Sequence, residues 1–367
     1  MTPPARDTHS FNGSPMRAVG FLVVGLMLAC AARPALAWSD PARRLIIEEA
    51  VRRLPEPLRG LWDGPAHLDR LQEAAAPDEG AEVPISPYGS DANPSRVFRV
   101  DAGGGEPPAF ADIPRDRSEA KTALGEETIR QMGTAPWAAA DALDRLSHAL
   151  TEGRTDAVFD SAGDLARAVT DCHMPLHTTT NHDGAQTGNH GVGGVVATGL
   201  MHRRLEVYHQ DLRQKRRCTH YVPHPTDRLF GWLAKAHSRV SPILKADAAA
   251  RQRATYNPAQ HPEHLTAPET AKPYYEALVT ELERHGSPVT SSLRDAADHL
   301  ADLLYTAWVR AGKPLELHPT PEADQETAAP PYWLLVLAAV MLLVLFLPRL
   351  RERREKENKG DTGSDAS

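Results

Sequence analysis

Residues 166–206 read ARAVTDCHMPLHTTTNHDGAQTGNHGVGGVVATGLMHRRLE, and the rest of the chain is organised around this stretch. It begins as a helix, which Pro175 ends or kinks because proline lacks an N–H and clashes with the preceding turn. A loop rich in glycine, asparagine and threonine follows, and a second helix begins near Leu200. Eight side chains in the stretch can bind a metal or transfer a proton: Asp171, His173, His177, His182, Asp183, His190, His202 and Glu206.

Three of these side chains have a spacing that suits a metal site. His177 lies in the turn after Pro175, and His202 and Glu206, four residues apart, share one face of the second helix. Imidazole and carboxylate groups on facing helices commonly hold divalent metals, zinc above all. A loop rich in histidine and asparagine is equally compatible with a solvated segment that binds nothing. The residues by themselves leave both interpretations open.

Helical periodicity extends through most of the chain, and abundant alanine, leucine and arginine favour helices. The first pattern lies within residues 38–64 and ends near Pro55. Residues 79–110 are rich in glycine and proline and predict a loop, with one short strand-like piece at 97–100. The predicted fold class is therefore all-α. Further helices are predicted over residues 118–132, 137–151, 159–173, 202–215, 229–247, 270–285 and 289–310.

The start of the chain matches a secretory signal over residues 1–37. Positive charge at Arg6 and Arg17 precedes an apolar run, and Ala35-Leu36-Ala37 is a small-residue cleavage site. Cleavage after Ala37 makes Trp38 the mature N-terminus. Lipidation of Cys30 is the alternative, although the residues before it match a lipidation motif poorly.

The end of the chain predicts a membrane anchor. Residues 332–348 form a nearly uncharged apolar run, which we interpret as one transmembrane helix. Residues 315–331 before it form a linker rich in proline, glutamate and threonine. The basic tail, 349–367, is expected to stay cytoplasmic, which places a helical domain of residues 38–314 on the outer face of the cell membrane.

The charge and the cysteine content bear on nucleic-acid binding and on disulfide formation. The 367 residues have a formal net charge of −7 with both signs mixed, so the composition implies no bulk affinity for nucleic acid. Of the three cysteines, Cys172 and Cys218 lie outside the predicted signal. They can pair in an oxidising compartment or remain as two free thiols.

Three pieces of the central stretch match a known signature. They are Asp-Cys-His-Met-Pro-Leu-His at 171–177, Gly-Asn at 188–189 and Leu-Met-His-x-x-Leu-Glu at 200–206. Together they resemble the zinc-dependent phospholipase C and single-strand-specific nuclease superfamily, whose members carry Gly-Asp-x-His-Gln-Pro-Leu-His, Gly-Asn and Leu-His-x-x-Trp-Asp. The resemblance covers roughly residues 38–314 and implies a multi-helix domain of that type. Members also begin with a mature tryptophan whose amine and carbonyl help to hold a zinc, the place that Trp38 would take.

The chain departs from the family at the positions of several zinc ligands. Arg43, Arg96 and Arg167 stand where the family has histidines, and Ala76 or a displaced Asp78 stands for an aspartate. A guanidinium group has no lone pair for zinc, and buried carboxylates left without a metal need another partner. We therefore predict that two of the three zinc positions have become an arginine–carboxylate network. In that network Arg167, one turn away, would pair with Asp171, while Arg43 and Arg96 would fill the rest of the site.

One zinc position is predicted to remain. His177, His202 and Glu206 would hold it, and Trp38 is the N-terminal ligand that the resemblance implies. Asp171 would be a fourth ligand or, if Arg167 neutralises it, would leave that place to water. The spacing from Gly-Asn to Leu-His in the nuclease-like members favours this ligand set.

An ungapped comparison with a bacterial branch of the superfamily gives a different alignment. It puts Gly193 and Ala197 at the positions of His202 and Glu206, which would abolish the zinc site.

The resemblance implies a zinc-dependent hydrolase of phosphoric esters, with one zinc here and up to three in the family. Zinc would lower the pKa of a bound water toward about 7. Asp171 and Arg167 would act in catalysis, and Arg43 and Arg96 would hold the substrate phosphate. The substrate would be a phospholipid or a single-stranded nucleic acid, and no protein partner is implied. Two alternatives are a catalytically inactive protein that binds a phosphate ligand and a purely structural descendant with solvated histidines.

Overall fold

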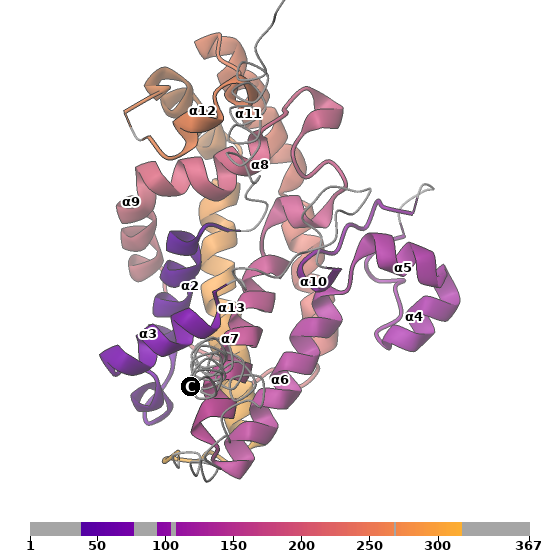
Figure 1. The fold of residues 1–367 in the computed structure, drawn as a ribbon, viewed down its shortest axis with the longest axis vertical. Coiled ribbons are helices and arrows are strands. Elements are labelled where there is room, and N and C mark those ends of the chain that lie inside the picture. Colours follow the sequence, from indigo (N-terminus) through magenta and orange to yellow (C-terminus); the bar gives the residue numbers. More distant parts are fainter. Residues whose placement is uncertain (1–37, 77–93, 104–107, 268, 318–367) are drawn as a thin grey trace, which may run out of the picture. The chain divides into compact units, whose positions relative to one another are not determined.

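The computed structural model describes residues 38–76, 94–103, 108–267 and 269–317, and this part of the chain is helical without any β-strand (Figure 1). The all-α prediction is confirmed for these residues. The chain divides into two units, Met1–His318 and Pro319–Ser367, and every described residue belongs to the first.

None of the described helices is long and apolar enough to cross a membrane. The predicted signal at 1–37, the transmembrane helix at 332–348 and the basic tail lie outside the described residues, as does nearly all of the linker.

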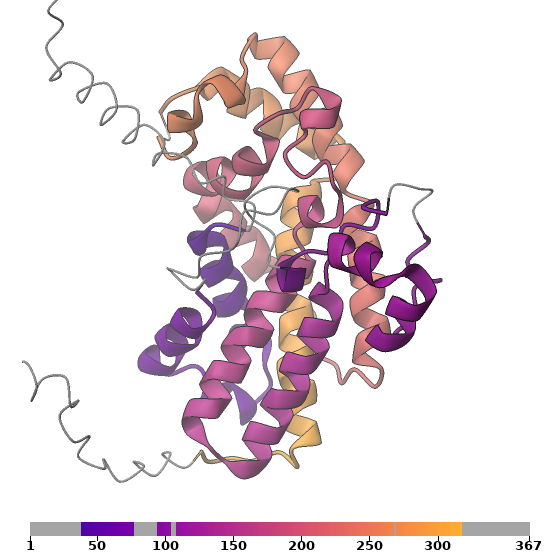
Figure 2. The same ribbon diagram turned by 45° about the vertical axis from the view of Figure 1, so that its right-hand side comes forward.

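The core of the described unit lies around one long helix, α13. Helices from the first two thirds of the chain pack against it, and Figures 1 and 2 show them surrounding it. The helices α6 and α7 form a hairpin, which Gly153 closes in a left-handed conformation with φ of 67°. These central helices are α2 (Asp40–Arg53), α6 (Ala135–Glu152), α7 (Thr155–Cys172), α9 (Leu200–Gln214) and α13 (Pro288–Arg310).

The remaining helices cover the sides of this core. The pair α11 and α12 packs together, α3 lies on α7, and α10 lies on α6. The helices concerned are α3 (Pro65–Ala74), α4 (Arg117–Leu124), α5 (Glu126–Met132), α10 (Pro225–His237), α11 (Val240–Ala254) and α12 (Lys272–Arg284).

Two predicted helices are each broken into two. The helix predicted over 118–132 is interrupted at Gly125, whose φ of 89° ends α4 and starts α5. The helix predicted over 229–247 stops at His237 and restarts at Val240. Pro242 sits in the first turn of α11, where its missing N–H costs nothing, but inside a continuous helix it would clash with the preceding turn.

The helix predicted to begin near Leu200 is α9 (Leu200–Gln214), and two short elements lead into it. A short helix α8 (Val192–Gly194) passes through a π-helical turn, η5 (Val195–Gly199), into α9. Gly199 is required there because a Cβ atom would lie 2.2 Å from the hydroxyl oxygen of Tyr275.

The strand-like piece at 97–100 is extended but does not form a strand. The N–H groups of Phe98 and Val100 donate to the carbonyls of His177 and Thr178, at 3.1 Å each. This places the segment against the turn η3 (Pro175–Thr178) that follows α7.

The side chain of Phe98 anchors a second, smaller apolar cluster. Its ring meets the rings of Trp137 and Phe230 edge-on, with centroids 5.7 Å and 5.4 Å away. Cys172 is buried in this cluster, whereas Cys218 is exposed, and both are free thiols. Of the two states that the sequence allows for this pair, the structure therefore has the unpaired one.

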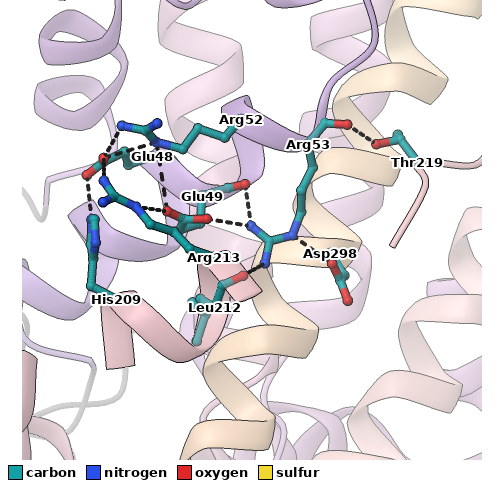
Figure 3. A network of polar contacts seen from close by, with 9 residues as sticks. All are labelled: Glu48, Glu49, Arg52, Arg53, His209, Leu212, Arg213, Thr219 and Asp298. Atoms are coloured by element: carbon teal, nitrogen blue, oxygen red, sulfur yellow. Dashed lines mark hydrogen bonds and ion pairs between the residues drawn. The ribbon is translucent and has the colours of Figure 1, made fainter. Parts of the chain in front are cut away.

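A buried ionic network fixes α2 against α9 and α13 (Figure 3). The Arg53 guanidinium contacts the Glu49 carboxylate at 3.1 Å and the Asp298 carboxylate at 2.7 Å, and it donates to the Leu212 carbonyl at 2.9 Å. The side chains of Glu49 and Arg53 are 0% and 1% exposed. Burial removes each of these charges from water, so its partners in the network must replace the lost hydration.

We predict that Arg53→Met destabilises the protein by about 3–5 kcal/mol, because it leaves the buried Glu49 carboxylate without its main partner. Urea unfolding, followed by circular dichroism, measures this loss. The matched control is Arg52→Met on the same helix. Arg52 pairs with Glu48 at 2.8 Å but its side chain is 44% exposed, so the expected loss is at most about 1 kcal/mol. Equal losses in the two variants would contradict the assignment.

Candidate functional site

Asp171, in the last turn of α7, is the centre of the candidate site, and its carboxylate is buried. Arg96 donates to it from Nε at 2.9 Å and from Nη2 at 3.5 Å. Arg96 ends the turn η2 (Pro94–Arg96), which is held against α6 because the N–H of Thr134 donates to the carbonyl of Pro94 at 2.6 Å. Asp171 is thus paired with a guanidinium that comes from a segment 75 residues away.

Gly133 permits this approach of the η2 segment. Its φ is 98°, and a Cβ atom at this position would lie 2.2 Å from the carbonyl oxygen of Val97. A side chain here would push the segment that carries Arg96 away from Asp171.

Arg43 forms the second guanidinium contact of the site. It is buried on α2, and its Nη2 donates to the carbonyl oxygen of Trp38 at 3.1 Å. Burial lowers the pKa of Arg43, and Arg96 and Arg167 lower it further, while Asp171 raises it. The carbonyl of Trp38, which the family resemblance assigns to zinc, is therefore bound by an arginine.

Arg167 does not pair with Asp171 as predicted. Its Nη2 donates to the Ala74 carbonyl at 3.1 Å and to Asp164 at 3.2 Å. The reason is that Arg96 already occupies both oxygens of Asp171. Of the three arginines in the predicted network, Arg96 provides the bond to the central carboxylate.

His177, which was predicted to bind zinc, lies next to Asp171. It is buried in η3, and its Nδ1 is 3.8 Å from Oδ1 of Asp171. Its backbone N–H donates to the Met174 carbonyl at 3.0 Å, in the turn that Pro175 begins.

The structure does not bring His202 and Glu206 to His177. Both side chains are exposed on α9, and Glu206 accepts a hydrogen bond from Gln210 at 3.2 Å. Among the described residues, no group of metal-ligating atoms that lie within 4.8 Å of one another contains any of these three. The predicted zinc ligand set is therefore not assembled.

The path of the α8–η5 segment explains this outcome. The N–H of Ser39 donates to the carbonyl of Ala197 at 3.1 Å, so Ala197 is the residue that lies beside Trp38. His202 comes five residues later, about 7 Å further along the helix. The geometry thus agrees with the ungapped alignment, which places Gly193 and Ala197 in the ligand positions, and neither side chain can bind a metal.

A cavity of about 510 Å³ lies next to Asp171 and is lined by charged side chains. Two atoms near it, Nη1 of Arg43 and Nε of Arg167, are buried and have no acceptor among the described residues. Buried guanidinium N–H groups without an acceptor are costly, and an anion would satisfy them. The charged residues that line the cavity are Arg96, Arg117, Arg145, Arg167, Asp141, Asp164 and Asp171.

The rest of the motif is structural in this chain. Asn189 of the Gly-Asn pair is buried and donates to Asp247 at 2.7 Å and to the Leu244 carbonyl at 3.0 Å. His190 is exposed and lies 3.0 Å from Asp183. Nδ1 of His182 lies 3.1 Å from the Thr180 carbonyl, within the loop itself.

His173, the other histidine of the motif, faces away from Asp171 into a buried pair that sequence reasoning missed. Its Nε2 is 2.7 Å from Nδ1 of His299 on α13, and its Nδ1 is 2.7 Å from the Val169 carbonyl. The His299 ring stacks on Trp232, with centroids 3.9 Å apart. No spacing in the sequence relates positions 126 residues apart, so only the fold could reveal this pair.

Burial lowers the pKa of His173 to about 4, and burial together with the neighbouring His173 lowers the pKa of His299. Both residues are therefore neutral near pH 7. Asp295 acts in the opposite direction on His173, while Arg239 and Lys235 lower its pKa further. In the unfolded chain these histidines have pKa values near 6.5. Below that pH the unfolded chain therefore binds protons that the folded pair does not bind.

No model of a known protein family matches this chain, and no curated protein matches it in a sequence search.

We predict that the free energy of unfolding falls as pH drops from about 6.5 toward 4, because protonation in this window favours the unfolded chain. His299→Phe keeps an aromatic ring on Trp232 and removes one of the two titrating groups. Its loss of stability over this window should be shallower than that of the wild type. Urea unfolding at several pH values measures both slopes, and equal slopes in the variant and the wild type would contradict the assignment.

Proposed function

We propose that this protein binds a phosphate ester, on the fold of the zinc-dependent phospholipase C and nuclease superfamily, with arginines in the positions of the metal ions. The proposal is supported by the helical fold of the described residues and by the positions of Trp38, Asp171 and His177. Arg43 binds the Trp38 carbonyl and Arg96 binds Asp171, so two oxygen atoms that the family resemblance assigns to zinc already have partners.

The observation that carries the proposal is the arginine-lined cavity beside Asp171. Four arginines and three aspartates line it, and Arg43 adds a further buried cation behind them. The planar guanidinium group matches two phosphate oxygens, and a charge-assisted hydrogen bond of this kind is among the strongest in proteins. A phosphate group in this cavity would accept from the unpaired Nε of Arg167 after a small shift of its side chain.

The donor set around Asp171 does not fit a zinc ion. One imidazole, His177, remains, and Arg96 already occupies the carboxylate of Asp171. His202 and Glu206 are on the exposed surface of α9. Binding without hydrolysis is therefore the function that this geometry favours over a zinc-dependent phosphoric-ester hydrolase.

We propose a phospholipid head group as the ligand class. The support is the apolar run at 332–348, which would anchor the domain to the outer face of the cytoplasmic membrane, next to lipid phosphates. The net charge of −7 disfavours a long nucleic-acid ligand, for which phosphate contacts dominate affinity.

We predict that the full-length protein binds glycerol 3-phosphate and that Arg167→Gln weakens this binding about 10- to 100-fold, the loss expected for one or two charge-assisted hydrogen bonds. Isothermal titration calorimetry measures the affinity. Arg130→Gln is the control, because Arg130 pairs with Glu127 on the exposed surface of α5, outside the cavity. A thermal melt of each variant shows whether the fold is retained.

The same preparations are then tested for turnover of bis(p-nitrophenyl) phosphate, with and without EDTA. The proposal expects no turnover in either condition. Turnover that EDTA abolishes would replace it with the metal-dependent hydrolase. Binding of a short single-stranded DNA in preference to glycerol 3-phosphate would reject the lipid ligand, and no binding of either probe would reject the binding function.

A further inference from the structure

A cluster of two histidines and one glutamate lies in the connection between α11 and α12, away from Asp171. The connection contains the turns η6 (Pro258–Gln260) and η7 (Pro262–Leu265), and the cluster is His261, Glu263 and His264. The sequence His-Pro-Glu-His places all three within one short turn. Imidazole and carboxylate groups in this combination are the ligands of open zinc sites.

The distances within the cluster are close to those of a metal site. Nδ1 of His261 is 3.3 Å from Oε1 of Glu263, and Nε2 of His264 is 3.6 Å from the same oxygen. One ligand atom from each residue lies within 4.8 Å of the other two. Bonds of about 2.1 Å at tetrahedral angles separate the ligand atoms of a zinc ion by about 3.4 Å. Small side-chain rotations therefore suffice to bring the three atoms onto one ion.

A hydrogen bond from outside the cluster sets the orientation of His264. The Tyr256 hydroxyl lies 2.9 Å from Nδ1 of His264. With a proton on Nδ1 donated to this oxygen, Nε2 carries the lone pair and points toward Glu263. The rings of His261 and His264 also stack, with centroids 4.9 Å apart and planes 9° from parallel.

The backbone of this connection is held in place by Arg203 of α9. Its guanidinium donates to the carbonyls of His264 at 2.7 Å and of Leu265 at 3.0 Å. A Cβ atom added at Gly194 would lie 2.9 Å from the Leu265 side chain, which shows how closely α8 packs against the same turn. The turn is therefore positioned by contacts that do not use the side chains of the cluster.

The charge on Glu263 suits a cation. Its Oε1 atom faces both Nδ1 of His261 and Nε2 of His264. Among the described residues, no lysine or arginine forms an ion pair with it. The second cluster of this composition, Glu48, Glu49 and His209, differs on this point. Arginines bind both of its carboxylates, and Figure 3 shows them in place.

We propose that His261, Glu263 and His264 bind one zinc ion, with water completing its coordination. The side chains are 44%, 64% and 29% exposed, so the ion has access from solvent. Zinc at this position would fasten the α11–α12 connection, against which the α8–η5 segment packs. The inference does not rest on the proposed phosphate binding, which uses a different part of the surface.

The test is titration of the full-length, chelator-treated protein with zinc chloride by calorimetry, with elemental analysis of the product. The wild type should bind one zinc per chain through this site. His264→Gln should weaken the binding by at least about 100-fold, because one of three protein ligands is lost. Tyr256→Phe should weaken it about tenfold or more, as is usual when the partner of a ligating histidine is removed.

Two variants serve as controls. His190→Gln removes an exposed histidine that also contacts a carboxylate, Asp183 at 3.0 Å, and should leave zinc binding unchanged. His202→Gln removes the ligand that the family resemblance predicts and should also have no effect. Zinc lost from the His202 variant and retained by the His264 variant would move the ion to the motif and overturn the proposal, as would equal affinity in all four variants. Binding of glycerol 3-phosphate, measured in parallel, should be the same in the His264 variant and the wild type.

Discussion

The contact of Arg53 with Glu49, Asp298 and the Leu212 carbonyl joins α2, α13 and α9, and the arrangement of the core depends on it. Burying an unpaired guanidinium would be prohibitive, so these three helices can meet only where its partners converge. The same α2 carries Arg43 and follows Trp38 directly. The buried contacts of Arg53 at the end of α2 thus help to position Arg43 and Trp38, at the start of α2, in the candidate site.

The candidate site uses the same principle, with arginines bound to its carbonyl and carboxylate oxygens. A zinc ion and a guanidinium group both interact favourably with carboxylate and carbonyl oxygens, which explains why Asp171 and the Trp38 carbonyl are compatible with either partner. They differ in how they bind, because zinc forms a coordinate bond with an imidazole lone pair, whereas a guanidinium group only donates hydrogen bonds. Arg43 and Arg96, which stand where the family resemblance places histidines, bind the Trp38 carbonyl and the Asp171 carboxylate.

The α8–η5 segment connects the two regions for which we propose ligands. On one side its Ala197 carbonyl accepts from Ser39, next to Trp38, and on the other its Gly194 packs against Leu265, next to His264. A π-helical turn in this segment is the kind of local irregularity that is common at functional sites. Buried Asp247 closes the adjoining loop by binding Asn189, Arg251 and Tyr274, so the Gly-Asn pair positions the loop.

The sequence alone determined the all-α class, most helix positions and the central place of Asp171 and His177, because apolar periodicity and a proline after a helix are local signals. The expectation that arginines replace metal ligands came from the family resemblance and stays a prediction. The sequence could not decide which arginine binds Asp171, because Arg96 reaches it from 75 residues away whereas Arg167 is near only along the helix. Nor could it show that Ala197, and not His202, lies beside Trp38, which follows from the contact of Ser39 with Ala197. The pairing of His173 with His299 was equally hidden from it. These outcomes depend on which surfaces pack together, and packing is settled by the whole chain.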